Sequence, residues 1–148
     1  MGLADASARD TSAGYRLEDQ VGYLLRLANQ RHALIFQANM LDGLTPTQFS
    51  ALVRLVELGE SSQNRLGRLV SMDVATIKGV VDRLHKKGLV SLAPDQTDRR
   101  RTTIRPTEMA LEMIAELHAM GSQISEETLE PLDGDERATL LRLLRKII

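Results

Sequence analysis

The feature that most constrains the fold of this 148-residue chain is a pair of short helical patterns joined by a tight turn. Ser61 or Ser62 can cap the first helix, because Ser side chains accept hydrogen bonds from free N–H groups at a helix N-terminus. Residues 71–73 leave room only for a turn, and Asp73 can cap the second helix. Apolar residues recur at helical spacing in both segments: Leu66, Leu69 and Val70, then Ile77, Val80, Val81 and Leu84. This pattern predicts a helix-turn-helix, whose second helix enters the DNA major groove.

A hairpin pattern follows the second helix, which ends at Gly88. Residues 89–92 and 102–104 are β-prone, and residues 94–101 read as the loop between them. Arg99, Arg100 and Arg101 stand together at its tip. An arginine on a protruding loop can enter the narrow minor groove beside a major-groove helix. Together the two patterns predict a winged helix-turn-helix, although an amphipathic helix pair with a solvated charged loop is the alternative.

The flanking segments are helical. Residues 15–43 carry apolar residues at helical spacing, and residues 106–148 predict two helices broken by Pro131 and Gly134. Thr45 to Gln48 form a capping box with Pro at the first helical position. We therefore predict a mainly α fold with a small β-hairpin wing: residues 1–14 a disordered tail, 15–43 and 106–148 a helical dimerisation region, and 44–105 the winged helix-turn-helix domain.

The predicted DNA contacts come from three places: the start of the first helix of the pair, the second helix away from its apolar stripe, and the hairpin loop. Small and polar side chains near the start of the second helix allow close approach to base edges. The candidates are Gln63, Asn64, Arg65, Ala75, Thr76, Lys78, Gly79, Arg83, Asp98, Arg99, Arg100 and Arg101.

The charge distribution favours this interpretation. The whole chain has a net charge of −1. Residues 61–105 carry ten Lys and Arg against four Asp and Glu, a net of +6, whereas the remainder has nine against sixteen, a net of −7. Positive charge is thus confined to the segment that would face DNA, as binding to phosphates requires.

The central region resembles the MarR family of bacterial transcription regulators. The match extends from about Leu44 to Glu108 and rests on Leu44–Phe49, Asn64–Leu69, Val81–Val90 and Asp98–Arg100. The resemblance implies an obligate dimer on a pseudo-palindromic operator, with Asp98 and Arg100 as the wing-tip pair and Arg100 in the minor groove. After the wing the chain departs from the family's Leu-Thr-Glu-x-Gly, because it has Pro106-Thr107-Glu108-Met109-Ala110. Residues 18–26 also look like the branch of this family that controls aromatic-acid degradation.

A homodimer and an effector are the expected partners besides operator DNA. The outer helices offer more apolar surface than the central lobe can cover, so a second copy would bury it. The effector, an aromatic acid or its coenzyme A thioester, would sit where the first helix meets those starting near Thr45 and Met109. The candidate contacts are Tyr23, Arg26, Leu27, Arg31, His32, Phe49, Met109 and Met113. Packing within the core is the alternative for the two methionines, and a surface or intersubunit ion pair is the alternative for Arg26. For His32 the alternative is a hydrogen-bonded or exposed histidine that contacts no ligand.

Other functional classes lack support. His32, His85 and His118 lie on separate elements without metal-ligand spacing, and there is no Cys. No glycine-rich phosphate loop or nucleophile elbow is present, so neither an enzyme nor a bound cofactor is expected. No apolar run approaches the ~18 residues that span a membrane, and the start lacks a signal-peptide pattern, so we expect a cytoplasmic protein. The remaining alternative is a helical protein-interaction module with vestigial DNA binding.

Overall fold

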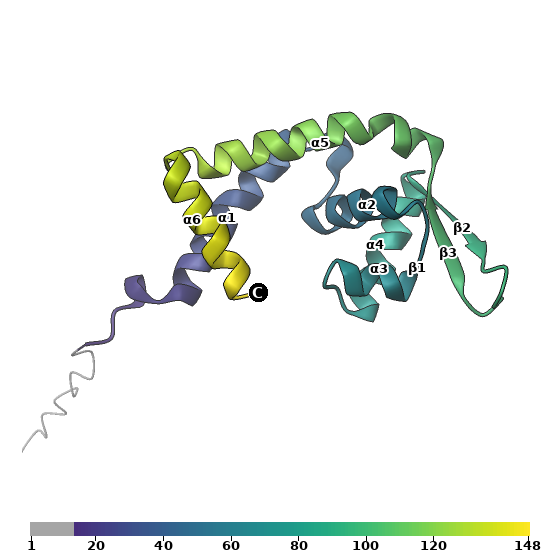
Figure 1. Cartoon of the computed structure of the whole chain (residues 1–148), viewed down its shortest axis with the longest axis horizontal. Helices are drawn as coiled ribbons and strands as arrows, with labels where there is room; N and C mark the ends of the chain where they lie inside the picture. Colours follow the sequence, from purple (N-terminus) through teal and green to yellow (C-terminus); the bar gives the residue numbers. More distant parts are fainter. Residues whose placement is uncertain (1–13) are drawn as a thin grey trace, which may run out of the picture.

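The computed structural model describes residues 14–148, so nearly all of the predicted N-terminal tail lies outside the described residues. Figure 1 shows a lobe of short helices with a projecting hairpin, and longer helices that extend from it. The elements in order are η1 (Leu17–Asp19), α1 (Val21–Asn39), η2 (Leu41–Gly43), α2 (Pro46–Leu58), β1 (Ser61–Ser62), α3 (Gln63–Leu69), α4 (Val74–Lys86), β2 (Val90–Pro94), β3 (Thr102–Pro106), α5 (Glu108–Leu129) and α6 (Gly134–Lys146).

The core of the lobe lies between α2, α3, α4 and the sheet. Its largest fully buried side chains are Leu52, Leu55, Leu66, Ile77, Val81, Leu84, Leu89, Val90 and Ile104 on these elements and their connections. Gly67 permits the close packing of α3 against α4, because a Cβ there would lie 3.1 Å from both Ile77 Cγ2 and the Met72 carbonyl oxygen. The predicted helix-turn-helix is therefore present, with its apolar stripes buried.

Side chains cap several of the helices, and the caps of α2, α3 and α4 are among those that the sequence predicted. Thr45 and Gln48 form the capping box of α2, and Asp133 and Glu136 form that of α6. Ser62, rather than Ser61, caps α3, because its Oγ accepts a hydrogen bond from the Arg65 N–H at 3.2 Å. Ser61 lies in a strand instead, and its side chain is buried.

The wing is a three-stranded antiparallel sheet in the order β1-β3-β2, larger than the predicted hairpin. β1 aligns Ser61 with Ile104 and Ser62 with Thr103. β2 continues to Pro94, which is tolerated because β2 is an edge strand. The β1–β3 pairing attaches the base of the wing to the start of α3, which places two segments of the predicted DNA interface side by side.

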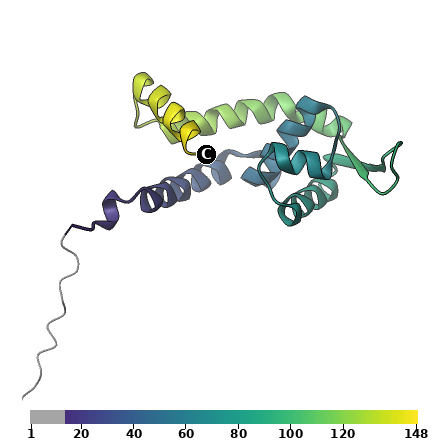
Figure 2. The same ribbon diagram turned by 60° about the horizontal axis from the view of Figure 1, so that its bottom comes forward.

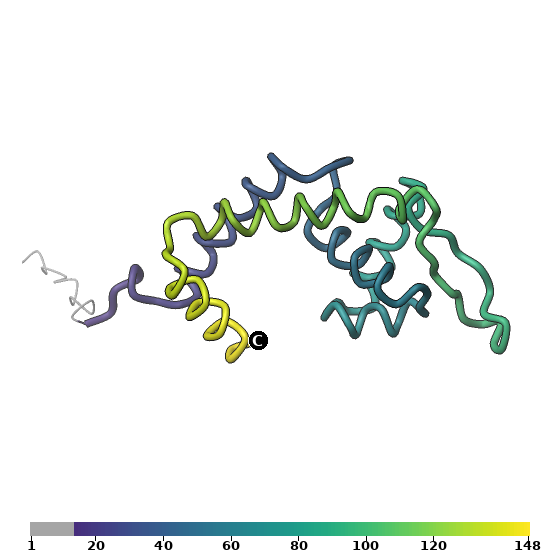
Figure 3. Tube along the Cα trace, turned by 45° about the horizontal axis from the view of Figure 1, so that its top comes forward, coloured from purple at the N-terminus to yellow at the C-terminus, as the bar shows by residue number. Residues whose placement is uncertain are grey.

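The helices α1, α5 and α6 form a frame outside the lobe. Figures 2 and 3 show α1 beside α5, and α6 folding back from the far end of α5. The predicted first helix over residues 15–43 is shorter than expected, because Gln20 and Met40 are extended and separate α1 from two 3₁₀ turns. Asp42 in the second turn takes a left-handed conformation, with φ of 54°. None of the helices within residues 14–148 is long and apolar enough to cross a membrane.

The frame leaves much apolar surface uncovered in the single chain. No residue of α6 is buried, and only Phe36 is buried in α1. The exposed apolar residues near the far end of the frame are Tyr15, Leu17, Val21, Leu24, Leu25, Leu141, Leu143, Ile147 and Ile148. Met109, for which packing within the core was the alternative to a ligand contact, is 45% exposed. It lies at the first turn of α5, one residue before the buried Ala110, and the tip of its side chain lies beside Gly88.

Candidate nucleic-acid interface and ligand site

Helix α4 occupies the position of a recognition helix. Asp73 caps its N-terminus, with Oδ1 accepting a hydrogen bond from the Thr76 N–H at 2.7 Å. The predicted contacts Ala75, Thr76 and Lys78 are exposed, because Ile77 and Val80 face the core. The sequence therefore identified the free face of this helix correctly, whereas the contact of these side chains with DNA stays a prediction.

Two of the predicted contacts on α4 interact within the helix. Lys78 Nζ lies 3.5 Å from Asp82 Oδ2, one turn away, in an exposed ion pair that is weak in water. The Arg83 side chain lies back over Gly79, since a Cβ at Gly79 would be 3.2 Å from Arg83 Nη1. The absence of a side chain at position 79 thus lets the Arg83 guanidinium lie along the helix surface.

The wing tip is organised by two aspartates. Asp95 Oδ1 accepts hydrogen bonds from the Thr97 hydroxyl at 2.7 Å, the Thr97 N–H at 2.8 Å and the Asp98 N–H at 3.3 Å. The Thr97 hydroxyl and then the Thr97 N–H hold the pKa of the Asp95 carboxyl below its ordinary value. Backbone bonds from Asp95 N–H to the Arg101 carbonyl and from Arg101 N–H to the Asp98 carbonyl close the loop. Asp95 was not among the predicted site residues.

The ion pair at the wing tip differs from the one that the family resemblance implies. Asp98 Oδ2 lies 3.7 Å from Arg101 Nε. Asp98 contacts Arg100 through the backbone, since its Oδ1 accepts a hydrogen bond from the Arg100 N–H at 3.0 Å. A short loop brings the carboxylate to the nearest N–H groups, which leaves the Arg100 side chain outside every ion pair found within residues 14–148.

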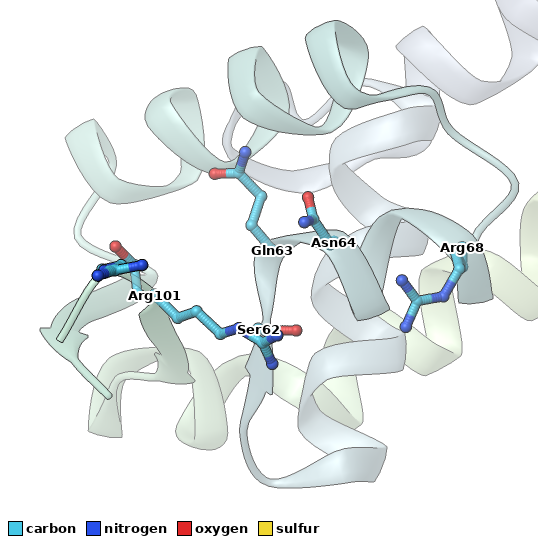
Figure 4. Close-up of a pocket in the computed structure, with 7 residues that line it drawn as sticks. Ser62, Gln63, Asn64, Arg68 and Arg101 are labelled. Atoms are coloured by element: carbon cyan, nitrogen blue, oxygen red, sulfur yellow. The ribbon is translucent and has the colours of Figure 1, made fainter. Parts of the chain in front are cut away.

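A basic cavity of about 350 Å³ lies between the start of α3 and the wing (Figure 4). It unites predicted contacts from two segments, namely Gln63 and Asn64 on α3 with Arg100 and Arg101 on the wing. Figure 4 shows Arg68 and Arg101 on opposite sides of Ser62, Gln63 and Asn64. Arg65 and Arg99, both predicted contacts, are exposed and do not line this cavity. Sequence reasoning missed Arg68, although it lies one turn from Arg65.

Removal of the Asp73 cap should destabilise the start of α4 in a pH-dependent way. The Thr76 N–H and then its hydroxyl hold the pKa of Asp73 below 3.8, so the ionised form is favoured in the folded state. This contribution is fully present above pH 3.8, the ordinary value of an unfolded aspartate, and is lost as pH falls further through the lower folded pKa. Asp73→Asn keeps a capping oxygen without the charge. At pH 7, urea unfolding should give similar free energies of unfolding for wild type and Asp73→Asn, and a lower one for Asp73→Ala. Below pH 3.8 the free energy of unfolding of wild type should fall relative to that of Asp73→Asn. A gap between wild type and Asp73→Asn that does not vary with pH would contradict the assignment.

The predicted ligand region contains an aromatic junction of three helices. Phe36 on α1 and Phe49 on α2 meet edge to face, with ring centroids 5.9 Å apart. Gly121 on α5 completes the junction, because a Cβ there would lie only 2.9 Å from Phe49 Cζ. His32 adjoins it, with its ring centroid 6.3 Å from that of Phe36. Phe36 and Gly121 were missed, since their proximity depends on long-range packing.

The hydrogen bonds of His32 fix its tautomer. The Thr128 hydroxyl donates to the Ile124 carbonyl at 2.8 Å, so it must accept from His32 Nδ1 at 2.8 Å. Nδ1 therefore carries a proton and Nε2 is left available for another partner. Arg31 is already engaged, because its Nη1 and Nη2 donate to the carbonyls of Thr128 at 2.6 Å and Glu127 at 2.9 Å, at the end of α5. Arg31 thereby caps that helix.

The eight predicted ligand contacts fall into separate groups in the single chain. His32 and Phe49 lie at the aromatic junction, and Arg31 lies beside it. The Arg26 guanidinium carbon lies 5.5 Å from the ring centroid of Tyr23, toward the start of α1, and Leu27 is exposed. Met113 and Met109 precede Gly121 on α5 by about 12 and 18 Å of helix length. Met109 lies near Gly88 instead, and Met113 packs against the lobe core.

Comparison with known proteins agrees with the fold. The MarR family profile matches residues 44–102. The HTH-type transcriptional repressor NicR of Pseudomonas putida is 41% identical over 97% of this chain and 91% of its own length.

Two solved structures are also similar. A probable transcriptional regulator from Pseudomonas aeruginosa is 46% identical, covers 90% of this chain and 100% of its own, and has a TM-score of 0.87. BpsR of Bordetella bronchiseptica, described as having its DNA binding regulated by 6-hydroxynicotinic acid, is 35% identical over 90% of this chain and 96% of its own, with a TM-score of 0.84. These similarities to transcriptional regulators agree with the prediction that the chain is not an enzyme. The chain belongs to the MarR family of winged helix-turn-helix transcriptional regulators.

Proposed function

We propose that this protein is a cytoplasmic homodimeric repressor that binds a pseudo-palindromic DNA operator and is released by a small aromatic acid. The observation that carries the proposal is the convergence of the α3 start and the arginine-bearing wing on one basic cavity, next to the free face of α4. A major-groove helix beside a minor-groove arginine reads bases and shape together. The DNA binding described for BpsR, which is regulated by 6-hydroxynicotinic acid, supports the same role.

The dimer follows from the uncovered apolar surface of the frame. Exposed leucines on α1 and α6, with Ile147 and Ile148 at the end of the chain, would be buried by a second copy. Two-fold symmetry then presents two α4 helices to half-sites about one DNA turn, ~34 Å, apart. The frame would thus set the spacing of the two α4 helices in the dimer.

The effector would contact the aromatic junction and the basic residues of α1. The free Nε2 of His32 and the rings of Phe36 and Phe49 suit an aromatic acid. Arg26 remains the candidate for its carboxylate because Arg31 is engaged at the end of α5, although in the single chain Arg26 lies with Tyr23 toward the start of α1, apart from the junction. The other predicted contacts, Tyr23, Leu27, Met109 and Met113, would line the remainder or touch the larger coenzyme A thioester. The ligand printed for BpsR, 6-hydroxynicotinic acid, is the first compound to test.

A DNA-binding titration with effector addition tests the proposal. We expect the protein to shift a fragment from upstream of its own coding region, with affinity falling steeply between about 50 and 200 mM salt. Benzoate, 6-hydroxynicotinic acid and an aromatic acyl-coenzyme A should then be added separately. One of them should release the DNA and raise the melting temperature of the free protein. At a hundredfold excess of ligand over Kd, the free energy of unfolding should rise by about 2.7 kcal/mol.

The outcomes separate the alternatives. Absence of any shift at low salt would favour the helical protein-interaction module. If the protein binds DNA and none of the aromatic compounds affects this binding, the result would agree with a DNA-binding repressor but refute an aromatic effector. Release by the thioester but not by the free acid would assign the effector to the coenzyme A class.

A further inference from the structure

Arg68 lies on the cavity side of α3 and was not among the predicted DNA contacts. It lines the basic cavity with Gln63, Asn64, Arg100 and Arg101. Arg65, three residues earlier on the same helix, was the predicted contact, yet it does not line the cavity. Residues three apart on a helix are neighbours, yet of these two arginines only Arg68 lines the cavity. The tertiary structure therefore assigns the two arginines different surroundings.

The cavity concentrates positive charge with little compensation. Three guanidinium groups, those of Arg68, Arg100 and Arg101, line it. Among residues 14–148, the ion pairs found include Arg101 with Asp98 but neither Arg68 nor Arg100. Like charges gathered around one space repel one another, and an anion placed between them removes that repulsion. The remaining lining is polar and includes the amide side chains of Gln63 and Asn64, which can donate hydrogen bonds.

We propose that this cavity binds one phosphate of the DNA backbone and that Arg68 is its principal charged contact. This inference rests on the proposed operator binding and adds a site to it. The β1–β3 pairing of Ser62 with Thr103 fixes α3 against the wing, so the cavity is preformed. A guanidinium fork matches the oxygens of a phosphate. The phosphate would lie between the DNA strand that α4 contacts and the minor groove that Arg100 enters. Binding of this phosphate would fix the positions of α4 and of the wing along the DNA.

The matched pair Arg68→Ala and Arg65→Ala tests the assignment, because both variants remove one exposed positive charge from the same helix. Operator affinity is measured by fluorescence anisotropy across a range of salt concentrations. We expect Arg68→Ala to weaken binding about tenfold near 100 mM salt and to lower the salt slope by about one per protomer. Arg65→Ala should cause a smaller loss of operator affinity and a smaller decrease of the salt slope. Arg68→Lys should restore most of the salt slope.

A neutral-phosphate scan locates the partner. Single methylphosphonates are placed along the operator, and each fragment is titrated with wild type, Arg65→Ala and Arg68→Ala. One position should weaken wild type and Arg65→Ala but leave Arg68→Ala unaffected. If wild type binds the operator and Arg68→Ala matches it, or if Arg65→Ala loses more than Arg68→Ala, the phosphate site is refuted and the repressor proposal stands. Failure of wild type to bind any upstream DNA refutes both.

Discussion

Introducing glutamate at Leu24 and Leu143 should dissociate the homodimer and lower operator affinity by at least about a hundredfold. Both leucines are half-exposed in the single chain, at 50% and 46%, so neither supports the core of the lobe. In a dimer that buries them, each protomer would place two carboxylates in an apolar contact, which is strongly unfavourable. A monomer must bind each half-site separately and so loses an effective-concentration advantage of about 10²–10⁴. Light scattering reports the mass, and anisotropy on the full operator reports the affinity.

The matched control is Leu111→Glu, on the lobe end of α5. Leu111 is also 50% exposed, so this variant carries the same chemical change at the same exposure. It should remain dimeric and bind the operator normally. A Leu24→Glu and Leu143→Glu double variant that stays dimeric with full affinity would show that the frame does not pair through these faces.

Arg100→Ala should weaken operator binding by roughly 1–3 kcal/mol for each wing contact. The Arg100 side chain is free of the ion pairs found within residues 14–148, while its backbone N–H is held by Asp98 at 3.0 Å. The tip is therefore preformed with the Arg100 guanidinium available, which reduces the entropy lost on binding. Narrow A·T-rich minor grooves attract such a group most strongly. The loss should thus be larger on operators with A·T-rich flanks than on operators with G·C-rich flanks.

Arg54→Ala serves as the charge-matched control, because Arg54 is an exposed arginine of α2 whose Nη1 lies 2.6 Å from Glu57 Oε2. Operator affinity of this variant should be close to wild type. An Arg100→Ala protein with unchanged affinity on both kinds of flank would remove Arg100 from the minor groove. Equal losses on both flanks would instead assign Arg100 to the backbone phosphates.

Local chemistry made much of the fold predictable. The caps at Thr45, Asp73 and Asp133 depend on side chains within three residues of the N–H groups they accept, so they can be read along the chain. The same holds for the buried stripe of α4, which follows from helical periodicity. The confinement of positive charge to residues 61–105 is likewise a property of the sequence. These features were sufficient to predict a winged helix-turn-helix.

Features that depend on contacts between distant segments were not predictable. β1 is two residues long and has no strand pattern of its own, so only its pairing with β3 reveals it. Asp98 could have paired with any arginine of the wing, and loop geometry selected Arg101. The aromatic junction joins residues 36, 49 and 121, whose meeting depends on how three helices cross.

The sequence by itself therefore determined most of the helices, the predicted recognition helix and the basic segment, because each follows from interactions within a turn or two of chain. Tertiary structure decided which side chains share a surface. It placed Arg68 rather than Arg65 in the cavity beside the wing, engaged Arg31 at the end of α5, and left His32 Nε2 available. The physical reason is that periodicity gives the face of each element, whereas packing between elements decides what that face meets.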